Sequence, residues 1–317
     1  MDKLIDINAY PVKDTLKILL QDKSTKKNII WATDIYSEYG PGFNDKNQIK
    51  LSLFNWTDAF KLRPRISKTL EEQQERTRKK AEVMTPVWLC NKMNNYADEQ
   101  WFGRKDVFNH ENNDNTWTVN EEKIVFDGKR TWKKYVDSRR LEITCGEAPY
   151  LVSRYDTTTG ELIVPPINRI GFLDRKLRVV NENTSTEEEW LKWAIRAIQS
   201  CYGYEYQGDN LLIARINVLL SFYEYFLEQW NHEPDMKTLK RIANIICWNI
   251  WQMDGLKDTV PLGKPYEENQ QMTMFDFLEY EENNTQPTET TDEAVPCKIY
   301  DWRANTSMLF KDCKKRG

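Results

Sequence analysis

Apolar and polar positions along the chain follow two periods, one typical of helices and one of short strands. Helical spacing of apolar residues extends over 185–199, 208–230 and 236–248. Shorter apolar runs predict strands, a buried one at RLEIT (140–144) and two more at YGYEYQ (202–207) and NIWQMDG (249–255). Strands that alternate with helices indicate an open parallel sheet with helices on its faces. The pattern therefore predicts an α/β fold with a Rossmann-like sheet, preceded by a mostly helical N-terminal region.

Polar residues predict how several segments begin and end. Ser67 opens a charged helix that should stop before Pro86, and its cations should form a solvated face because glutamates lie among them. Asp209 is the expected cap of the long helix, and Thr85 is the expected cap of a helix that begins at Pro86. The Asn-rich stretch 109–123 is expected to be a loop. The cations of the charged helix include Arg76, Arg78, Lys79 and Lys80.

Composition shifts along the chain predict four regions. Residues 1–80 form an N-terminal region with the charged helix, and 81–265 form the domain that carries the sheet. Residues 266–295 are polar and acidic, as expected of a linker or loop. Residues 296–317 should contribute a strand from Lys298 to Trp302 and a tail.

Overall composition excludes several classes of protein. The 317 residues carry a net charge of −4, so any contact with nucleic acid must come from a local patch or a partner. Six cysteines without a CxxC pair and two isolated histidines argue against a disulfide framework and a metal site. A long apolar run and a signal peptide are both missing, which predicts a cytoplasmic protein without a membrane span.

Chemically suggestive residues follow the three predicted strands. Gly146 ends the first strand, Glu205 the second and Asp254 the third. In doubly wound sheets ligands bind at these carboxyl ends, where glycine lets the backbone approach a cofactor and an acidic side chain accepts ribose hydroxyls. A lone glycine or acid there is more often a turn or a helix cap, but the three in order favour a cofactor site.

Four motifs resemble those of the amino-methylating DNA methyltransferases that use S-adenosylmethionine, most of all the modification subunits of type I restriction systems. AEVMTPVWLCNKM (81–93) is similar to the Thr-Pro motif that precedes a helix, and LEITCGEAPYL (141–151) to the glycine-containing loop after the first strand. YGYEYQGDNLLIARINVLL (202–220) resembles the ribose-binding strand with its helix. NIWQMDGL (249–256) resembles the strand whose Asp contacts the adenine.

The resemblance implies an S-adenosylmethionine site. Thr85 would lie near the methionine end of the cofactor and Glu142 near its amino group. Glu205 would hold the ribose and Asp254 would face the adenine. The loop between these groups would consist of Thr144, Cys145 and Gly146.

Departures from the family pattern concern both the loop and the catalytic motif. Glu147 and Ala148 replace a small residue and a second glycine, and 157–185 is expected to be an insertion between the first two strands. The catalytic Asn-Pro-Pro-aromatic motif is absent from the sequence. Asp301 and Trp302 are the candidate acid and aromatic that could replace it.

Two functions remain open at this point. The first is a DNA methyltransferase-like protein of a restriction-modification or mobile-element system, which would methylate adenine in DNA with a specificity or other partner subunit. The second is a catalytically inactive homologue that serves as a binding or regulatory module. Fold alone does not decide between them, because function depends on the site.

Overall fold

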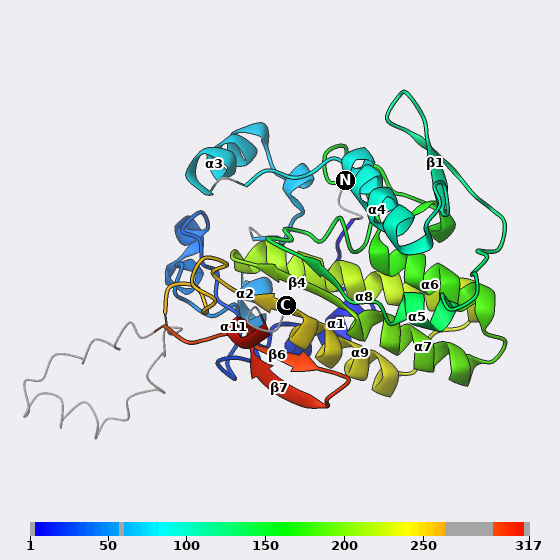
Figure 1. The fold of residues 1–317 in the computed structure, drawn as a ribbon. Helices are drawn as coiled ribbons and strands as arrows, with labels where there is room; N and C mark the ends of the chain where they lie inside the picture. Colours follow the sequence, from blue (N-terminus) through cyan, green and yellow to red (C-terminus); the bar gives the residue numbers. More distant parts are fainter. Residues whose placement is uncertain (1–3, 57–59, 81, 264–293, 314–317) are drawn as a thin grey trace, which may run out of the picture.

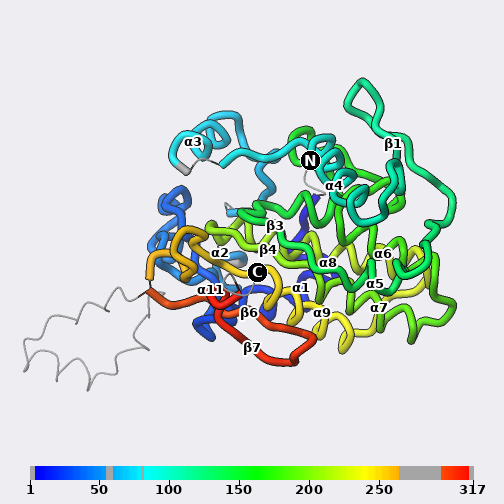
Figure 2. The backbone as a smooth tube through the Cα atoms, viewed as in Figure 1, coloured from blue at the N-terminus to red at the C-terminus, as the bar shows by residue number. Residues whose placement is uncertain are grey.

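A three-stranded parallel sheet lies at the centre of the molecule. The computed structural model describes residues 4–56, 60–80, 82–263 and 294–313. The sheet comprises β3 (Arg140–Glu142), β4 (Cys201–Glu205) and β5 (Ile250–Gln252), in the order β3-β4-β5. Figure 2 shows β3 running beside β4. The predicted parallel sheet is confirmed, but three short strands are fewer than a full Rossmann sheet contains.

Helices form a layer against this sheet (Figure 1). Two of them begin where a side chain caps the first turn, because Thr186 accepts a hydrogen bond from the Glu189 amide and Asp235 accepts one from the Thr238 amide. The layer consists of α1 (Val12–Leu19), α6 (Phe172–Asn183), α7 (Glu187–Gln199), α8 (Gly208–Trp230) and α9 (Met236–Asn249).

The remaining elements surround this core. The N-terminal part is mostly helical, with η1 (Ser37–Tyr39), η2 (Pro41–Phe43), α2 (Leu51–Trp56), η3 (Arg65–Ser67), α3 (Leu70–Lys80) and α4 (Val87–Phe102). Further along lie β1 (Asn109–Glu111), β2 (Trp117–Val119), α5 (Trp132–Val136) and η4 (Pro166–Asn168). The C-terminal part contains β6 (Lys298–Asp301), β7 (Thr306–Leu309) and α11 (Phe310–Cys313).

The two faces of the sheet pack against different partners. Side chains alternate along a strand, so neighbouring residues point to opposite faces. Ile250 belongs to the main apolar core with the helices. Trp251 instead packs with Tyr204 and with Phe310 of the C-terminal segment, in a second apolar cluster. The C-terminal hairpin β6–β7 therefore helps to cover the sheet face that the helices leave open.

Burial in β3 is the reverse of the prediction. RLEIT was expected to be a buried strand, but Leu141 and Ile143 are 48% and 63% exposed and Glu142 is only 8% exposed. β3 is an edge strand, and Leu141 and Ile143 line a cavity. The apolar side chains are exposed there because no element covers them among the described residues.

Helix starts also differ from the prediction at two positions. Asp209 does not cap α8, because the cap residue is Gln207 and the Asp209 carboxylate is buried against cations. Thr85 does not cap α4, whose cap position is taken by Pro86 without a side-chain hydrogen bond.

Two segments, one predicted to be a loop and the other an insertion, contain regular structure. Residues 109–123 include the antiparallel pair β1–β2. The expected insertion 157–185 contains η4 and α6, whose Leu173 and Leu177 belong to the main core. α6 is therefore part of the fold's framework, since it packs on both α7 and α8.

Arg76 is another departure, because the helix that carries it was expected to present its cations to solvent. Arg78 and Lys79 of α3 are exposed, but the Arg76 side chain is fully buried. Within the described ranges, none of the helices combines the length and apolar composition that crossing a bilayer requires.

Candidate functional site

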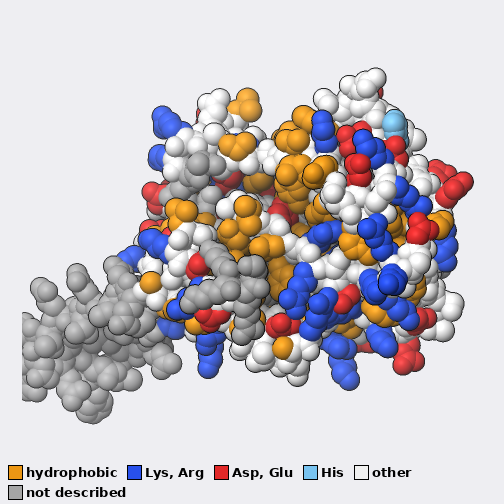
Figure 3. All heavy atoms as spheres, viewed as in Figure 1, with side chains coloured by type: hydrophobic (Ala, Val, Ile, Leu, Met, Phe, Trp, Pro, Cys, Tyr) orange, Lys and Arg blue, Asp and Glu red, His pale blue; other side chains and the backbone are white. Residues whose placement is uncertain are grey.

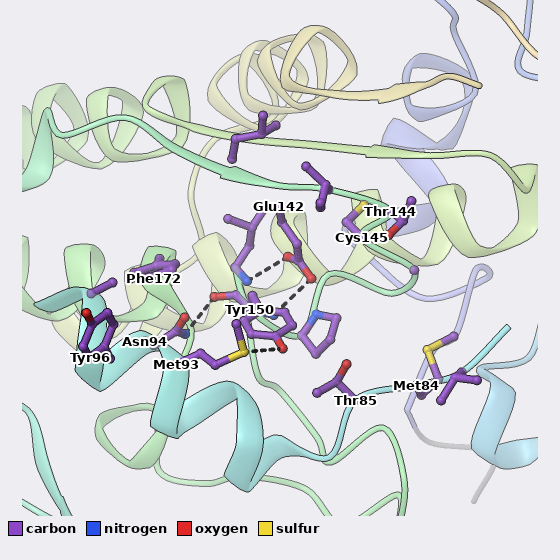
Figure 4. Close-up of a pocket in the computed structure, with 17 residues that line it drawn as sticks. Met84, Thr85, Met93, Asn94, Tyr96, Glu142, Thr144, Cys145, Tyr150 and Phe172 are labelled. Atoms are coloured by element: carbon purple, nitrogen blue, oxygen red, sulfur yellow. Dashed lines mark hydrogen bonds between the residues drawn. The ribbon is translucent and has the colours of Figure 1, made fainter. Parts of the chain in front are cut away.

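A cavity of about 570 Å³ opens at the carboxyl end of β3. This volume lies within the range of pockets that hold small molecules and cofactors. The walls come from the segment before α4, from α4 itself, from β3 and its following loop, and from the start of α6 (Figure 4). Its lining comprises Val83, Met84, Thr85, Met93, Asn94, Tyr96, Ala97, Leu141, Glu142, Ile143, Thr144, Cys145, Gly146, Pro149, Tyr150, Leu151 and Phe172.

Glu142 fixes the loop that forms one wall of this cavity. Its carboxylate accepts hydrogen bonds from the backbone amides of Tyr150, at 3.3 Å, and Leu151, at 3.1 Å (Figure 4). Burial raises the pKa of Glu142 to about 8, and these two amide donors oppose the increase. Glu142 is thus a buried acid that a nearby cation would drive towards its ionised form.

Glu205 holds the beginning of the same loop. Its carboxylate accepts hydrogen bonds from the backbone amides of Gly146, at 2.9 Å, and Gln207, at 3.1 Å. Burial raises the pKa of Glu205 to about 7. Glu205 does not line the cavity. Its carboxylate was expected to bind the ribose of a cofactor, but here it stabilises the loop through the hydrogen bond from Gly146.

Glycine is favoured at position 146 by the backbone conformation and by the nearby Met84 side chain. The residue has a φ of +53°, a left-handed conformation that side chains disfavour. A Cβ placed there would lie 3.3 Å from the Met84 sulfur. Gly146 therefore lets the loop turn tightly against the segment that precedes α4.

The polar groups of two other loop residues, Glu147 and Cys145, point away from the cavity. Glu147 was expected to bring a carboxylate into the loop, but it is buried and accepts hydrogen bonds from the Arg65 amide and the Tyr155 hydroxyl, both at 2.6 Å. Cys145 packs its sulfur towards Gly203 in the sheet, and burial raises the pKa of its thiol. The carboxylate of Glu147 is therefore not an obstacle to a ligand.

Thr85 reaches the cavity from a distant part of the sequence. It precedes Gly146 by 61 residues, yet both line the same space. The Thr85 backbone carbonyl accepts a hydrogen bond from the Thr157 hydroxyl at 3.0 Å, which anchors the segment. Met84, Thr85 and the loop after β3 thus form opposite sides of one opening.

The mouth of the cavity is rich in exposed apolar side chains. Val83 is 74% exposed, Tyr96 66%, Ile143 63%, Met93 53% and Leu141 48%. A contiguous exposed apolar patch commonly marks an interaction site. Together with the hydroxyls of Thr85 and Thr144, these groups suit an organic ligand that has both apolar and polar parts.

Asp254 lies outside the cavity, although it follows the third strand as predicted. Its carboxylate accepts hydrogen bonds from the amides of Leu256 and Lys257, which closes a turn. It does not contribute to the lining. In this structure the side chain stabilises the loop after β5.

Asp301 and Trp302 lie at the opposite end of the sheet from the cavity. Asp301 pairs with Arg139, the residue directly before β3, at 3.2 Å. The Trp302 indole donates a 2.7 Å hydrogen bond to Asn249, the residue directly before β5. Neither residue lines the cavity, so the catalytic role suggested by sequence is not supported by its position.

Several cavity residues were not identified from sequence. Phe172 comes from a helix taken to be an insertion, and Tyr96 lies on the helix after the Thr-Pro step, beyond the matched motif. Met84 lies beside Thr85 in that motif, but it is apolar and was not identified as a candidate site residue. Among the described residues, no group of three or more His, Cys, Asp and Glu side chains is arranged to hold a metal ion.

Comparison of the chain with models of known protein families, with curated proteins and with solved structures found no match.

Proposed function

We propose that this chain is a DNA methyltransferase-like protein of a restriction-modification or mobile-element system that binds S-adenosylmethionine in the cavity beside β3. The strongest support is that the Thr-Pro segment and the glycine loop line the same cavity. They do so although Thr85 precedes Gly146 by 61 residues. The sequence resemblance pairs these two motifs around one cofactor. Their meeting in a cavity of suitable size is what such a site requires.

The polar groups of the cavity suit the charged end of this cofactor. S-adenosylmethionine carries an ammonium and a sulfonium, and Glu142 is the acidic side chain in the lining. Because its pKa of about 8 leaves it largely protonated near neutrality, a bound cation would favour its ionised form. Cofactor binding should therefore release a proton. The exposed apolar side chains at the mouth, Tyr96 among them, would cover the adenosine part.

Among the described residues, the candidate catalytic pair Asp301 and Trp302 is absent from the cavity lining. An amino-methylating site needs an acceptor for the amine and an aromatic platform beside the methyl donor. Asp301 and Trp302 lie at the other end of the sheet. This position favours the second candidate function, a catalytically inactive homologue that serves as a binding or regulatory module, over a chain that methylates adenine by itself.

Calorimetry with S-adenosylmethionine on the purified chain tests the cofactor proposal. Thr85→Val removes one hydroxyl while keeping the shape, and it should weaken binding roughly 3- to 10-fold, the value of one neutral hydrogen bond. Thr306→Val, at an exposed position of β7, is the matched control and should bind like the parent. Titrations in two buffers with different ionisation heats should reveal the proton released from Glu142.

Two results would count against the proposal. If the parent chain gives no binding signal, the cavity is not an S-adenosylmethionine site. If the purified chain alone transfers labelled methyl groups to mixed-sequence DNA, the proposal of an inactive module is wrong and the chain is itself the enzyme.

A further inference from the structure

A second hollow crosses the helical layer on a surface separate from the cofactor cavity. It has a volume of about 760 Å³ and lies across α5, α7 and α9. It shares no lining residue with the cavity beside β3. We call it the basic groove, and define it by Lys133, Lys134, Lys192, Trp193, Arg196 and Arg241.

The charge of this groove is opposite to that of the whole chain. Five Lys and Arg side chains line it, against the two acidic residues Asp137 and Glu188. The Asp137 carboxylate already forms two ion pairs. One is with Arg196, and the other, at 2.7 Å, is with Arg303, which lies outside the groove. Figure 3 shows Lys and Arg side chains gathered over this part of the molecule. The groove therefore presents a net positive surface.

One cation of the groove is held in position by aromatic rings. The rings of Trp132 and Trp193 meet edge to face, with centroids 4.9 Å apart. The Lys133 ammonium lies 5.3 Å from the centroid of each ring. Cation–π attraction orients a lysine at little cost to its remaining hydrogen-bonding capacity. Lys133 can thus donate to an anion from a fixed place.

The negative net charge of the chain is concentrated in one stretch of sequence. Residues 264–293 contain nine Asp and Glu and one Lys, a charge of −8, so the other 287 residues carry +4. The part of the molecule that carries the groove is thus basic. A polyanion is attracted to such a surface even though the whole chain is acidic.

We propose that the basic groove binds the phosphate backbone of duplex DNA. Cations from three helices, Lys133 of α5, Lys192 of α7 and Arg241 of α9, face one shallow groove. Lysine and arginine bind phosphate by charge and hydrogen bonds, and such contacts position DNA without reading its sequence. The choice of DNA over other polyanions rests on the proposed function. The site itself is separate from the cofactor cavity.

Fluorescence anisotropy with a short labelled DNA duplex over a series of salt concentrations tests the groove. The triple variant Lys133→Gln, Lys192→Gln, Arg241→Gln removes one charge from each helix. Since each phosphate contact contributes about 0.9 to the slope of log affinity against log salt, the slope should become shallower by roughly 3. Affinity at low salt should fall by roughly tenfold or more, and equally for duplexes of unrelated sequence.

Two control variants separate the groove from general charge. Lys133→Arg, Lys192→Arg, Arg241→Lys keeps the charges and should retain binding. Lys61→Gln, Lys92→Gln, Lys105→Gln removes the same charge at exposed positions outside the groove, and should change affinity little. Circular dichroism of each variant checks that the fold is kept.

The outcomes distinguish this inference from the proposed function. Unchanged DNA binding by the groove variant, equal loss in the Lys61 control, or no DNA binding by the parent would overturn the groove proposal. Calorimetry with S-adenosylmethionine should give the parent value for the groove variant. If the parent binds DNA but gives no binding signal with S-adenosylmethionine, the cofactor site is rejected and the groove proposal stands.

Discussion

The buried carboxyl group of Glu142 makes the stability of the protein depend on pH. Its pKa rises from 4.5 to about 8 on folding because burial penalises the charged form. Between these values the folded state keeps a proton that the unfolded state releases. The stabilisation is fully present below about pH 4.5 and is lost as pH rises through about 8. Glu205, with a pKa raised to about 7, acts in the same direction.

We predict that Glu142→Gln flattens this pH dependence. The parent should lose up to about 1.4 kcal/mol of unfolding free energy per pH unit and per retained proton. The variant lacks the contribution of Glu142, so its unfolding free energy should fall less steeply between about pH 5 and 8. Urea denaturation at several pH values measures the difference. Glu71→Gln, at an exposed position of α3, should keep the parent slope, and a parent-like slope for Glu142→Gln would contradict the prediction.

At the scale of elements, a buried ionic cluster joins α3 to the start of α8. Asp209 of α8 contacts Arg76 of α3 at 2.9 Å, Lys68 at 3.3 Å and the Tyr36 hydroxyl at 2.6 Å. Burial disfavours the charge, but Arg76 and Lys68 outweigh it and hold the pKa of Asp209 well below its usual value. Asp209 therefore contributes stability at neutral pH that is lost as pH falls through its folded pKa.

We expect Asp209→Asn to destabilise the protein strongly and to loosen α3. The change removes the anion that Lys68 and Arg76 share, while Arg76 keeps its buried pair with Glu82. Breaking a buried ion pair typically costs about 3–5 kcal/mol. Chemical denaturation measures the loss, and hydrogen exchange should increase first in α3. Glu75→Gln removes the exposed partner of Lys79 on the same helix and should have little effect. Equal effects of the two substitutions would show that burial of the cluster is unimportant.

At the scale of the whole molecule, the sheet depends on apolar packing on both of its faces. One face belongs to the main core, and the other packs Tyr204 and Trp251 against the C-terminal segment. The Phe310 ring centroid lies 5.2 Å from that of Trp251 and 6.0 Å from that of Tyr204. The segment after residue 293 is therefore part of the structure that holds the sheet in place.

Phe310→Ala should accordingly destabilise the entire fold. Removing a buried phenylalanine typically costs about 3–5 kcal/mol through lost burial and the cavity left behind. Tryptophan fluorescence and circular dichroism should report one common unfolding transition at lower denaturant. Leu256→Ala, at a side chain that is 97% exposed, should leave the transition unchanged. A separate early transition in fluorescence alone would show instead that the C-terminal cluster unfolds independently.

The sequence by itself determined the order of the three sheet strands and the existence of several of the helices that pack on them. The apolar periods of 185–199 and 236–248 predicted α7 and α9, and the three short runs predicted the strands of a parallel sheet. These features follow from spacing between near neighbours in the chain. For the same reason the sequence could place Gly146 in the loop after a strand, although β3 ends earlier than predicted, at Glu142.

Only the tertiary structure decided which side chains are buried and which lie together. Leu141 and Ile143 are exposed and Glu142 is buried because β3 is an edge strand beside a cavity. Arg76 is buried because Asp209, 133 residues later, meets it. Asp301 and Trp302 lie at the amino end of the sheet because β6 turns back beside α9. Each outcome depends on contacts between distant segments, and the period of a local pattern contains no information about them.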